Sequence, residues 1–287
     1  MRLKLGIQMS YRDILLPILT YPDQPSPGPI KAAFHLTKQF EANLTAVLLD
    51  LDPHRSAWPS SLGTSLAGIA DLVGEAVAQS RANSRQIMEQ LKAESSKSRV
   101  KLSIVHEPTA VFPVTTPTAE RARLYDLTIM PATSGFDRWF REGIIFGSGS
   151  PVLLVPDDRN GVSLETVVVA WDFSLAASRA LRASIPLLSK ARSVRIFTIA
   201  NEKESTQGHT IAELERHLAE HKITFTYDNV DIAGRSIGEA FRAYTQSVGA
   251  DMLVMGAFGH SRIREFVLGG ATQSMLAESN LPVLFAH

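Results

Sequence analysis

The feature that most constrains the fold is an internal repeat of strand-like segments. Tyr125–Met130 and Ala250–Met255 each carry an Asp followed by an apolar run that ends in Met. Pro151–Val155 and Pro282–Ala286 each begin Pro-Val-Leu. The members of each pair occupy equivalent places in the two halves of the chain, as a fourth and a fifth strand. The chain is therefore expected to use one arrangement of strands and helices twice.

Short β-branched or aliphatic runs alternate with longer segments of helical period throughout both halves, which is typical of βαβ units around a parallel sheet. The expected strands are Asp13–Leu19, Leu44–Leu51, Val100–Val105, Asp126–Met130, Val152–Val155, Thr166–Trp171, Val194–Ile199, Thr224–Val230, Met252–Met255 and Val283–Ala286. The expected helices lie near Pro29–Phe40, Ala67–Lys97, Pro117–Leu124, Leu175–Lys190, Ile211–His221, Ser236–Val248 and Thr272–Glu278. A polar segment, 156–165, separates the halves, so we predict two α/β domains, 1–157 and 162–287, each a doubly wound sheet of five parallel strands.

Composition narrows the range of functions. The 29 Lys and Arg residues balance 29 Asp and Glu residues, so the net charge attracts neither nucleic acid nor an anionic membrane. The absence of cysteine excludes disulfides, thiolate nucleophiles and Cys-ligated metals. No apolar run is long enough to span a bilayer. These properties predict a cytoplasmic protein.

The two copies differ directly after the fourth strand. The second copy has 31 positions from Asp251 to Pro282, whereas the first has 25 from Asp126 to Pro151. The extra residues belong to a glycine-rich segment, Gly256–Thr272, in which glycines at 256, 259 and 269 follow the spacing G-x2-G-x9-G. Glycines after a parallel strand and before a helix let backbone amides approach an anion such as phosphate. Taken alone, such glycines are equally consistent with simple turns.

This spacing resembles the nucleotide-binding signature of the universal stress protein family. The strand-end Asp172 in Val168–Ser174 and the closing Pro-Val-Leu strand agree with that family. The resemblance covers nearly the whole chain, as a tandem member. It implies two Rossmann-like domains of the adenine nucleotide alpha hydrolase-like type, joined as an intramolecular pseudo-dimer. It also implies that the final strands, Val152–Val155 and Val283–Ala286, pair across the interface.

The resemblance implies one adenine-nucleotide site, for ATP, ADP or AMP, in the second domain. Its residues would be Ala170, Asp172 and Ile199 at the adenine and ribose, Gly256 and Gly259 near the ribose and phosphates, and Gly269, Gly270, Ala271 and Thr272 at the phosphate chain. Gly270 departs from the family pattern, which has Ser or Thr there, so AMP or ADP is an alternative to ATP. Magnesium would be held by the nucleotide and water. We predict no catalytic residue and no protein metal site.

The first domain lacks both the strand-end Asp and the glycine spacing that indicate the site in the second domain. Leu19 stands where the acid is expected, and Pro131, which has no N–H, follows the fourth strand. The first domain is thus predicted not to bind nucleotide in the family manner, and to serve as a structural partner or as a site for another ligand. The resemblance implies a regulatory protein in the stress response that signals to an unknown protein partner. Slow ATP hydrolysis in the same site and a ligand-free scaffold are the alternatives, and whether two chains form a homodimer is left open.

Two further motifs have two interpretations each. Gly234–Gly238 matches the G-x-S-x-G nucleophile elbow of hydrolases, but Ser236 and Glu239 also form a helix capping box. Too few strands follow for a hydrolase sheet, which favours the capping box. His217 and His221 have a spacing that suits a metal, yet charged neighbours favour a solvated helix face.

Overall fold

The computed structural model describes residues 10–55, 66–110, 115–132, 138–159, 161–200, 208–257, 270–277 and 279–287. The strands are β1 Asp13–Leu19, β2 Asn43–Leu51, β3 Lys101–Thr109, β4 Leu127–Pro131, β5 Val152–Val155, β6 Thr166–Ala170, β7 Ser193–Ile199, β8 Thr226–Val230, β9 Met252–Gly256 and β10 Val283–Ala286. The helices are α1 Pro27–Phe40, α2 Leu66–Ser98, α3 Thr115–Ala122, α4 Arg138–Gly147, α5 Leu175–Leu188, α6 Gly208–Glu220, α7 Ile237–Ser247 and α8 Gly270–Ala277, with a 3-10 turn η1 at Pro53–Arg55.

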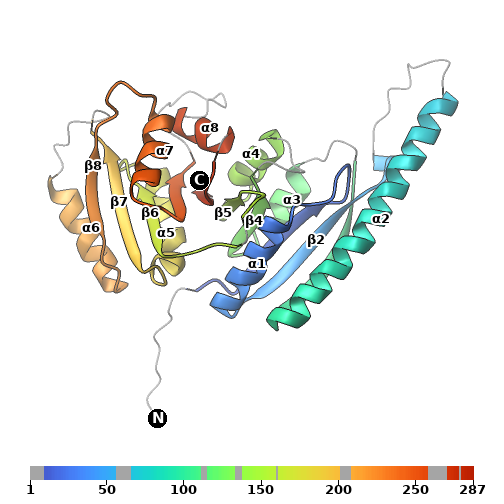
Figure 1. The fold of residues 1–287 in the computed structure, drawn as a ribbon, viewed down its shortest axis with the longest axis horizontal. Helices are drawn as coiled ribbons and strands as arrows, with labels where there is room; N and C mark the ends of the chain where they lie inside the picture. The colour runs from blue at the N-terminus through green and yellow to red at the C-terminus, as the bar shows by residue number, and fades with distance from the viewer. Residues whose placement is uncertain are drawn as a thin grey trace, which may run out of the picture.

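All these strands form one ten-stranded sheet in the order β3-β2-β1-β4-β5-β10-β9-β6-β7-β8 (Figure 1). Within each half the strands are parallel, and the second half repeats the order of the first in reverse. The predicted fold of two doubly wound five-stranded units is confirmed.

The two halves meet where β5 and β10 pair antiparallel. The register places Leu284 opposite Leu153 and Phe285 opposite Val152, and all four side chains are fully buried. The expected pairing of the final strands is therefore confirmed. Because each strand covers the edge of the other half's sheet, neither edge is left open for pairing with another chain.

Helices cover both faces of the sheet. One buried cluster joins the strands to α1, α2, α5 and α6, and a second joins them to α3, α4, α7 and α8. In β5 the side chains alternate between the two, with Leu153 and Val155 in the first cluster and Val152 and Leu154 in the second. Burial on both faces explains why these strands appear in the sequence as continuous apolar runs.

The repeated Asp before the fourth strand has a structural role in both halves. Asp126 accepts hydrogen bonds from the backbone N–H groups of Arg12 and Asp13, at 2.6 and 3.0 Å. Asp251 accepts one from Thr166 N, at 2.8 Å. Each carboxylate thus fixes the start of the first strand of its half beside the start of the fourth, which is why the same residue occurs in both copies.

Helix α4 was not predicted from the sequence. Its residues Phe140, Ile144 and Ile145 are buried against the sheet. A short amphipathic segment of this kind becomes helical because packing supplies the stabilisation that ten residues in water lack.

Candidate functional site

Three of the predicted site residues lie where β6, β7 and β9 end. Ala170 closes β6, Ile199 closes β7 and Gly256 closes β9, and β6 pairs with both other strands. The chain order reverses between β6 and β9, so this edge is the topological switch point of the second half. Ligands of open α/β sheets bind outside the carboxyl ends of the strands at such a point.

Asp172 lies in the turn between β6 and α5. Its Oδ1 accepts a hydrogen bond from Ser174 N at 2.9 Å, and Phe173 between them has φ of 61°, in the left-handed region. Ser174 in turn caps α5 by accepting from Ala177 N at 3.0 Å. The turn therefore holds the carboxylate at the sheet edge through local hydrogen bonds and an unusual backbone conformation.

Ala170 and Ile199 are both buried, at 8% and 4% exposed. They belong to the same apolar cluster, beside the end of the sheet. The backbone of the neighbouring Trp171 is fixed on both sides, because its N–H donates to Phe197 O and its carbonyl accepts from Thr198 Oγ1, each at 2.8 Å. The ends of β6 and β7 thus present an apolar surface whose backbone is held by hydrogen bonds.

Gly256 makes a close approach between β9 and the first turn of α5. A Cβ atom at this position would lie 2.5 Å from the carbonyl carbon of Ala176 and 2.6 Å from Ala177 N. A glycine is therefore required there by packing, whatever its part in ligand binding. The sequence motif did not separate these two roles.

Helix α8 carries the other described residues of the site. Gly270 begins the helix and is exposed, with open space where a side chain would stand, whereas Ala271 is half-buried and Thr272 is 2% exposed. Ser274 fixes the helix against α7, since its Oγ accepts from Arg242 at 2.6 Å. Gly259 and Gly269 lie outside the described residues.

At the end of β1, the corresponding edge of the first half is occupied by its own side chains. Thr20, which follows Leu19, is fully buried and bonds both Leu49 O and Ser80 Oγ, at 3.0 and 2.7 Å. Asn83 of α2 donates to Thr20 O at 2.9 Å. The cavity beside Leu19 and Pro131 has a volume of about 20 Å³, which accommodates little more than a water molecule.

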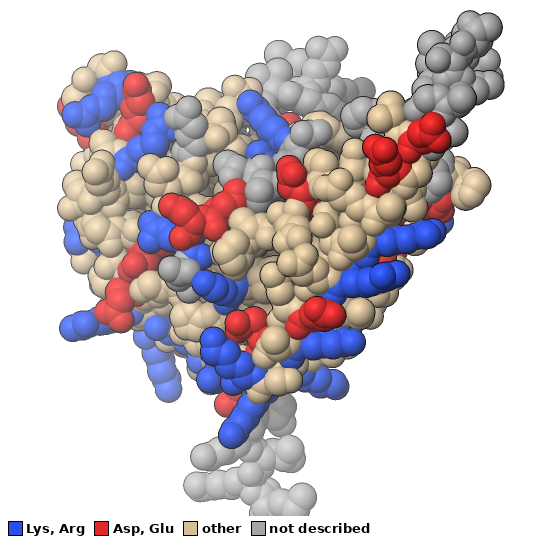
Figure 2. Space-filling model, turned by 45° about the vertical axis from the view of Figure 1, so that its right-hand side comes forward, with Lys and Arg blue, Asp and Glu red and all other residues tan. Residues whose placement is uncertain are grey.

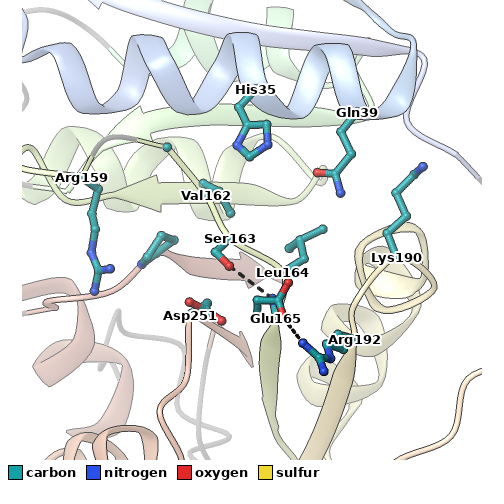
Figure 3. A pocket seen from close by; sticks show the side chains of 12 residues that line it. His35, Gln39, Arg159, Val162, Ser163, Leu164, Glu165, Lys190, Arg192 and Asp251 are labelled. Atoms are coloured by element: carbon teal, nitrogen blue, oxygen red, sulfur yellow. Dashed lines mark hydrogen bonds and ion pairs between the residues drawn. The ribbon is translucent and has the colours of Figure 1, made fainter.

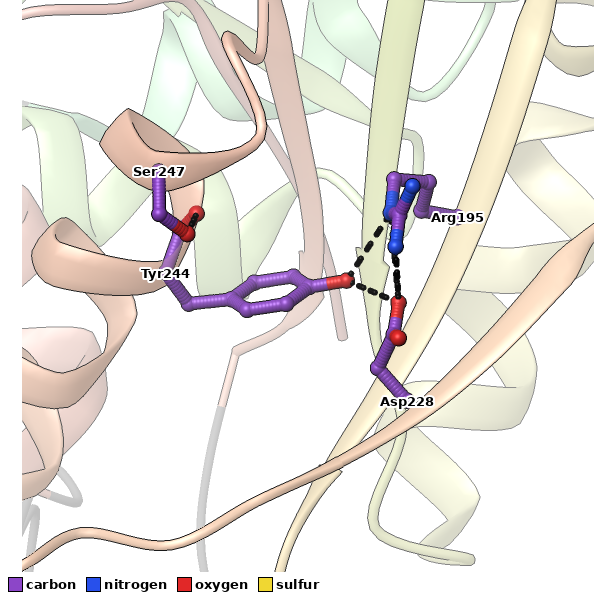
Figure 4. Close-up of polar contacts among 4 residues, drawn as sticks. All are labelled: Arg195, Asp228, Tyr244 and Ser247. Carbon is purple, nitrogen blue, oxygen red and sulfur yellow. Dashed lines mark hydrogen bonds and ion pairs between the residues drawn. The ribbon is translucent and has the colours of Figure 1, made fainter.

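A polar cluster joins β7, β8 and α7 in the second half (Figure 4). Tyr244 donates to Asp228 Oδ2, which also accepts from Arg195 Nη2 at 2.8 Å. Burial raises the pKa of Tyr244 to about 12, so its hydroxyl stays protonated at neutral pH and cannot act as a base. We assign this cluster to positioning α7 on the sheet.

Ser236 is the N-cap of α7. Its Oγ accepts from Glu239 N at 3.3 Å, and the Glu239 carboxylate accepts from Ser236 N at 2.8 Å, which completes a capping box. The Ser236 hydroxyl also donates to Glu239 Oε2 at 2.8 Å, and this bond, together with the one from Ser236 N, lowers the pKa of Glu239. The structural interpretation of G-x-S-x-G is therefore confirmed.

Replacing Ser236 with alanine is expected to lower the free energy of unfolding by about 1 kcal/mol, because the helix loses its cap. Ester hydrolysis by the variant should equal that of the unaltered protein. Urea denaturation and a nitrophenyl ester assay check the two expectations. Esterase activity that disappears with Ser236 would instead restore the nucleophile interpretation.

His217 and His221 lie edge to face on α6 with ring centroids 5.2 Å apart. Within the described ranges, no three His, Cys, Asp or Glu side chains come together as metal ligands.

No helix in those ranges combines the length and apolar character needed to cross a membrane.

The sequence of the second half is similar to that of a known protein family. Residues 163–287 match the sequence model of the Universal stress protein family. Universal stress protein Slr1230 of Synechocystis sp. is 30% identical over 146 residues, which cover 50% of this chain and 49% of that protein. The match thus spans about half the length of this curated relative.

Solved structures resemble the chain over nearly its full length. A universal stress protein from Archaeoglobus fulgidus superposes with a TM-score of 0.69 at 16% identity, covering 96% of this chain and 95% of that one. A protein of unknown function from Pseudomonas aeruginosa PAO1 gives 0.59 at 13% identity, covering 96% and 92%. These likenesses show that both halves share the fold of those proteins.

Proposed function

Because the chain belongs to the universal stress protein family, we propose that its second half binds an adenine nucleotide and acts as a regulatory switch in the stress response. The observation that carries the proposal is the position of Asp172 and Gly256 at the carboxyl ends of the neighbouring strands β6 and β9. We further propose domain limits of 1–157 and 162–287, and action in the cytoplasm through a protein partner.

The residues present fit a nucleotide. The Asp172 carboxylate can accept a hydrogen bond from the adenine or ribose, over the apolar floor formed by Ala170 and Ile199. The amide end of α8 at Gly270 is exposed and has no atom within 4 Å where a Cβ would stand. Such a helix start favours an anion through its free N–H groups and its dipole.

Nucleotide identity follows from the same residues. Gly270 offers a backbone amide and no side-chain hydroxyl, so we propose AMP and ADP as ligands alongside ATP. Bound magnesium would be held by phosphate oxygens and water, since the described residues contain no cluster of metal ligands. Occupancy would then alter the surface that a partner binds.

Replacing Asp172 with alanine tests the proposal. We expect affinity for AMP, ADP and ATP to fall by about tenfold or more, because a charged acceptor is lost. Isothermal titration measures the change. Asp231→Ala is a matched control, since Asp231 follows β8 and accepts from Ala233 N at 2.9 Å in the same kind of turn.

Equal affinities in the two variants, or no heat with any nucleotide in the unaltered protein, would contradict nucleotide binding at Asp172. Mass spectrometry of the purified protein identifies any nucleotide that it carries from the cell. If the unaltered protein releases phosphate from ATP and the Asp172→Ala variant does not, the protein is an ATPase and the proposal of a regulatory switch is wrong.

A further inference from the structure

A hollow of about 490 Å³ lies between the two halves, at the edge where β6 and β9 begin (Figure 3). Helix α1 of the first half contributes His35 and Gln39, and the segment between the halves contributes Arg159 and Ser163. The second half contributes Lys190 and Arg192 after α5, and Asp251 before β9. Its volume is in the range of small-molecule sites. It lies at the opposite ends of the strands from the proposed nucleotide site.

The hollow has two cations without a carboxylate partner among the described residues. Lys190 Nζ lies 5.3 Å from the centre of the Phe40 ring, and Arg159 donates only to the backbone oxygen of Asn280, at 2.7 and 3.2 Å. The third cation, Arg192, is already paired with Glu165 at 3.2 Å. Because Asp251 also lines the hollow, its three cations face two carboxylates, which leaves a net charge of +1 and places the cations without a carboxylate partner at Lys190 and Arg159.

These two cations lie on opposite sides of the hollow. In Figure 3, Arg159 lies at one side, while Lys190 extends from the end of α5 at the other side, on the side of Gln39. A compact anion would neutralise only one of them. A ligand with an anionic group at each end would neutralise both.

Two polar side chains that line the hollow have hydrogen-bonding capacity left. Gln39 Oε1 is fully buried and has no hydrogen-bond partner in the described part of the chain. Ser163 Oγ accepts from Glu165 N at 3.3 Å, which leaves its own proton to donate. A buried amide oxygen without a donor is costly, and a ligand hydroxyl would supply that donor.

The side of the molecule where the strands begin carries many cations. Figure 2 shows Lys and Arg side chains gathered over the lower part of the molecule, where the strands begin, with fewer carboxylates between them. Although the chain as a whole is neutral, this edge presents a local positive potential.

We propose that the hollow binds a small polyhydroxylated molecule that carries a phosphate at each end. One phosphate contacts Lys190 and the other contacts Arg159, whose planar fork of donors suits phosphate oxygens. A ligand hydroxyl donates to Gln39 Oε1. Because residues of both halves surround it, such a ligand would stabilise their association.

Fructose 1,6-bisphosphate, fructose 6-phosphate and fructose serve as probes in isothermal titration of the full chain at fixed ionic strength. We expect the bisphosphate to bind about tenfold or more tightly than the monophosphate, and fructose not to bind. Lys190→Gln and Arg159→Gln should each reduce bisphosphate affinity to that of the monophosphate.

Arg182→Gln is the matched control, since it removes one charge from an exposed position of α5 outside the hollow and should leave bisphosphate affinity unchanged. Equal affinity for mono- and bisphosphate, or bisphosphate binding that Lys190→Gln and Arg159→Gln do not weaken, would overturn the proposal. AMP titrations of the same variants report on the nucleotide site separately, so either proposal can fail alone.

Discussion

Replacing Gly256 with alanine is expected to lower the free energy of unfolding by about 2–3 kcal/mol. The new Cβ would lie 2.5–2.8 Å from three atoms of Ala176 and Ala177, closer than non-bonded atoms approach a Cβ. Two of these atoms are backbone atoms in the capped first turn of α5, so they cannot swing away as a side-chain end would. Either β9 or α5 must shift, and the strand-end turn at Asp172 would shift with it.

Gly270→Ala is the matched substitution. No atom lies within 4 Å of the added Cβ, and alanine favours a helix over glycine by about 1 kcal/mol, so stability should be unchanged or raised. If phosphate approaches this glycine, nucleotide affinity should fall while stability does not. Urea denaturation of both variants checks the first comparison, and titration with AMP checks the second. A Gly256→Ala protein as stable as the Gly270→Ala protein would show that the close approach is not a constraint.

Replacing Leu284 with alanine is expected to cost about 3–5 kcal/mol. Leu284 is fully buried at the antiparallel junction, opposite Leu153 of the other half. Its removal leaves a cavity in the middle of the sheet, where strands on both sides prevent collapse. Because this strand joins the halves, the loss should lower the stability of the whole sheet.

Leu124→Ala provides the control, since Leu124 is 82% exposed. The same chemical change there should alter stability by less than about 0.5 kcal/mol. Chemical denaturation followed by circular dichroism measures both variants. A cost at Leu284 that is no larger than the cost at Leu124 would mean that the β5–β10 pairing contributes little to the fold.

Much of the fold could be predicted from the sequence because it rests on local periodicity. Each expected strand overlaps an observed one, since runs such as Val167–Val169 are apolar on both faces and can only be buried. Ser236 and Glu239 also determine their own structure, because a capping box is formed by residues three apart. Helix α4 was missed because its stability comes from contacts of Phe140 and Ile144 with distant strands.

For the candidate site too, some features could be predicted from the sequence and others could not. The spacing of the glycines and Asp172 located it, because the ends of neighbouring parallel strands meet at one edge. What each glycine does could not be learned from spacing. The roles of Gly256 as a packing contact and Gly270 as open backbone depend on which atoms of α5 and α7 come near.

The sequence alone therefore determined two copies of a parallel α/β unit, and placed the one intact glycine motif after the fourth strand of the second copy. The resemblance to a family already implied that the final strands pair across the interface, whereas only the tertiary structure decided that β5 and β10 run antiparallel in this register, and what lies between the halves. The hollow lined by Gln39, Arg159 and Lys190 has no signature in the sequence. Gln39 is 120 positions from Arg159 and 151 positions from Lys190, and only long-range packing brings these three side chains to one hollow.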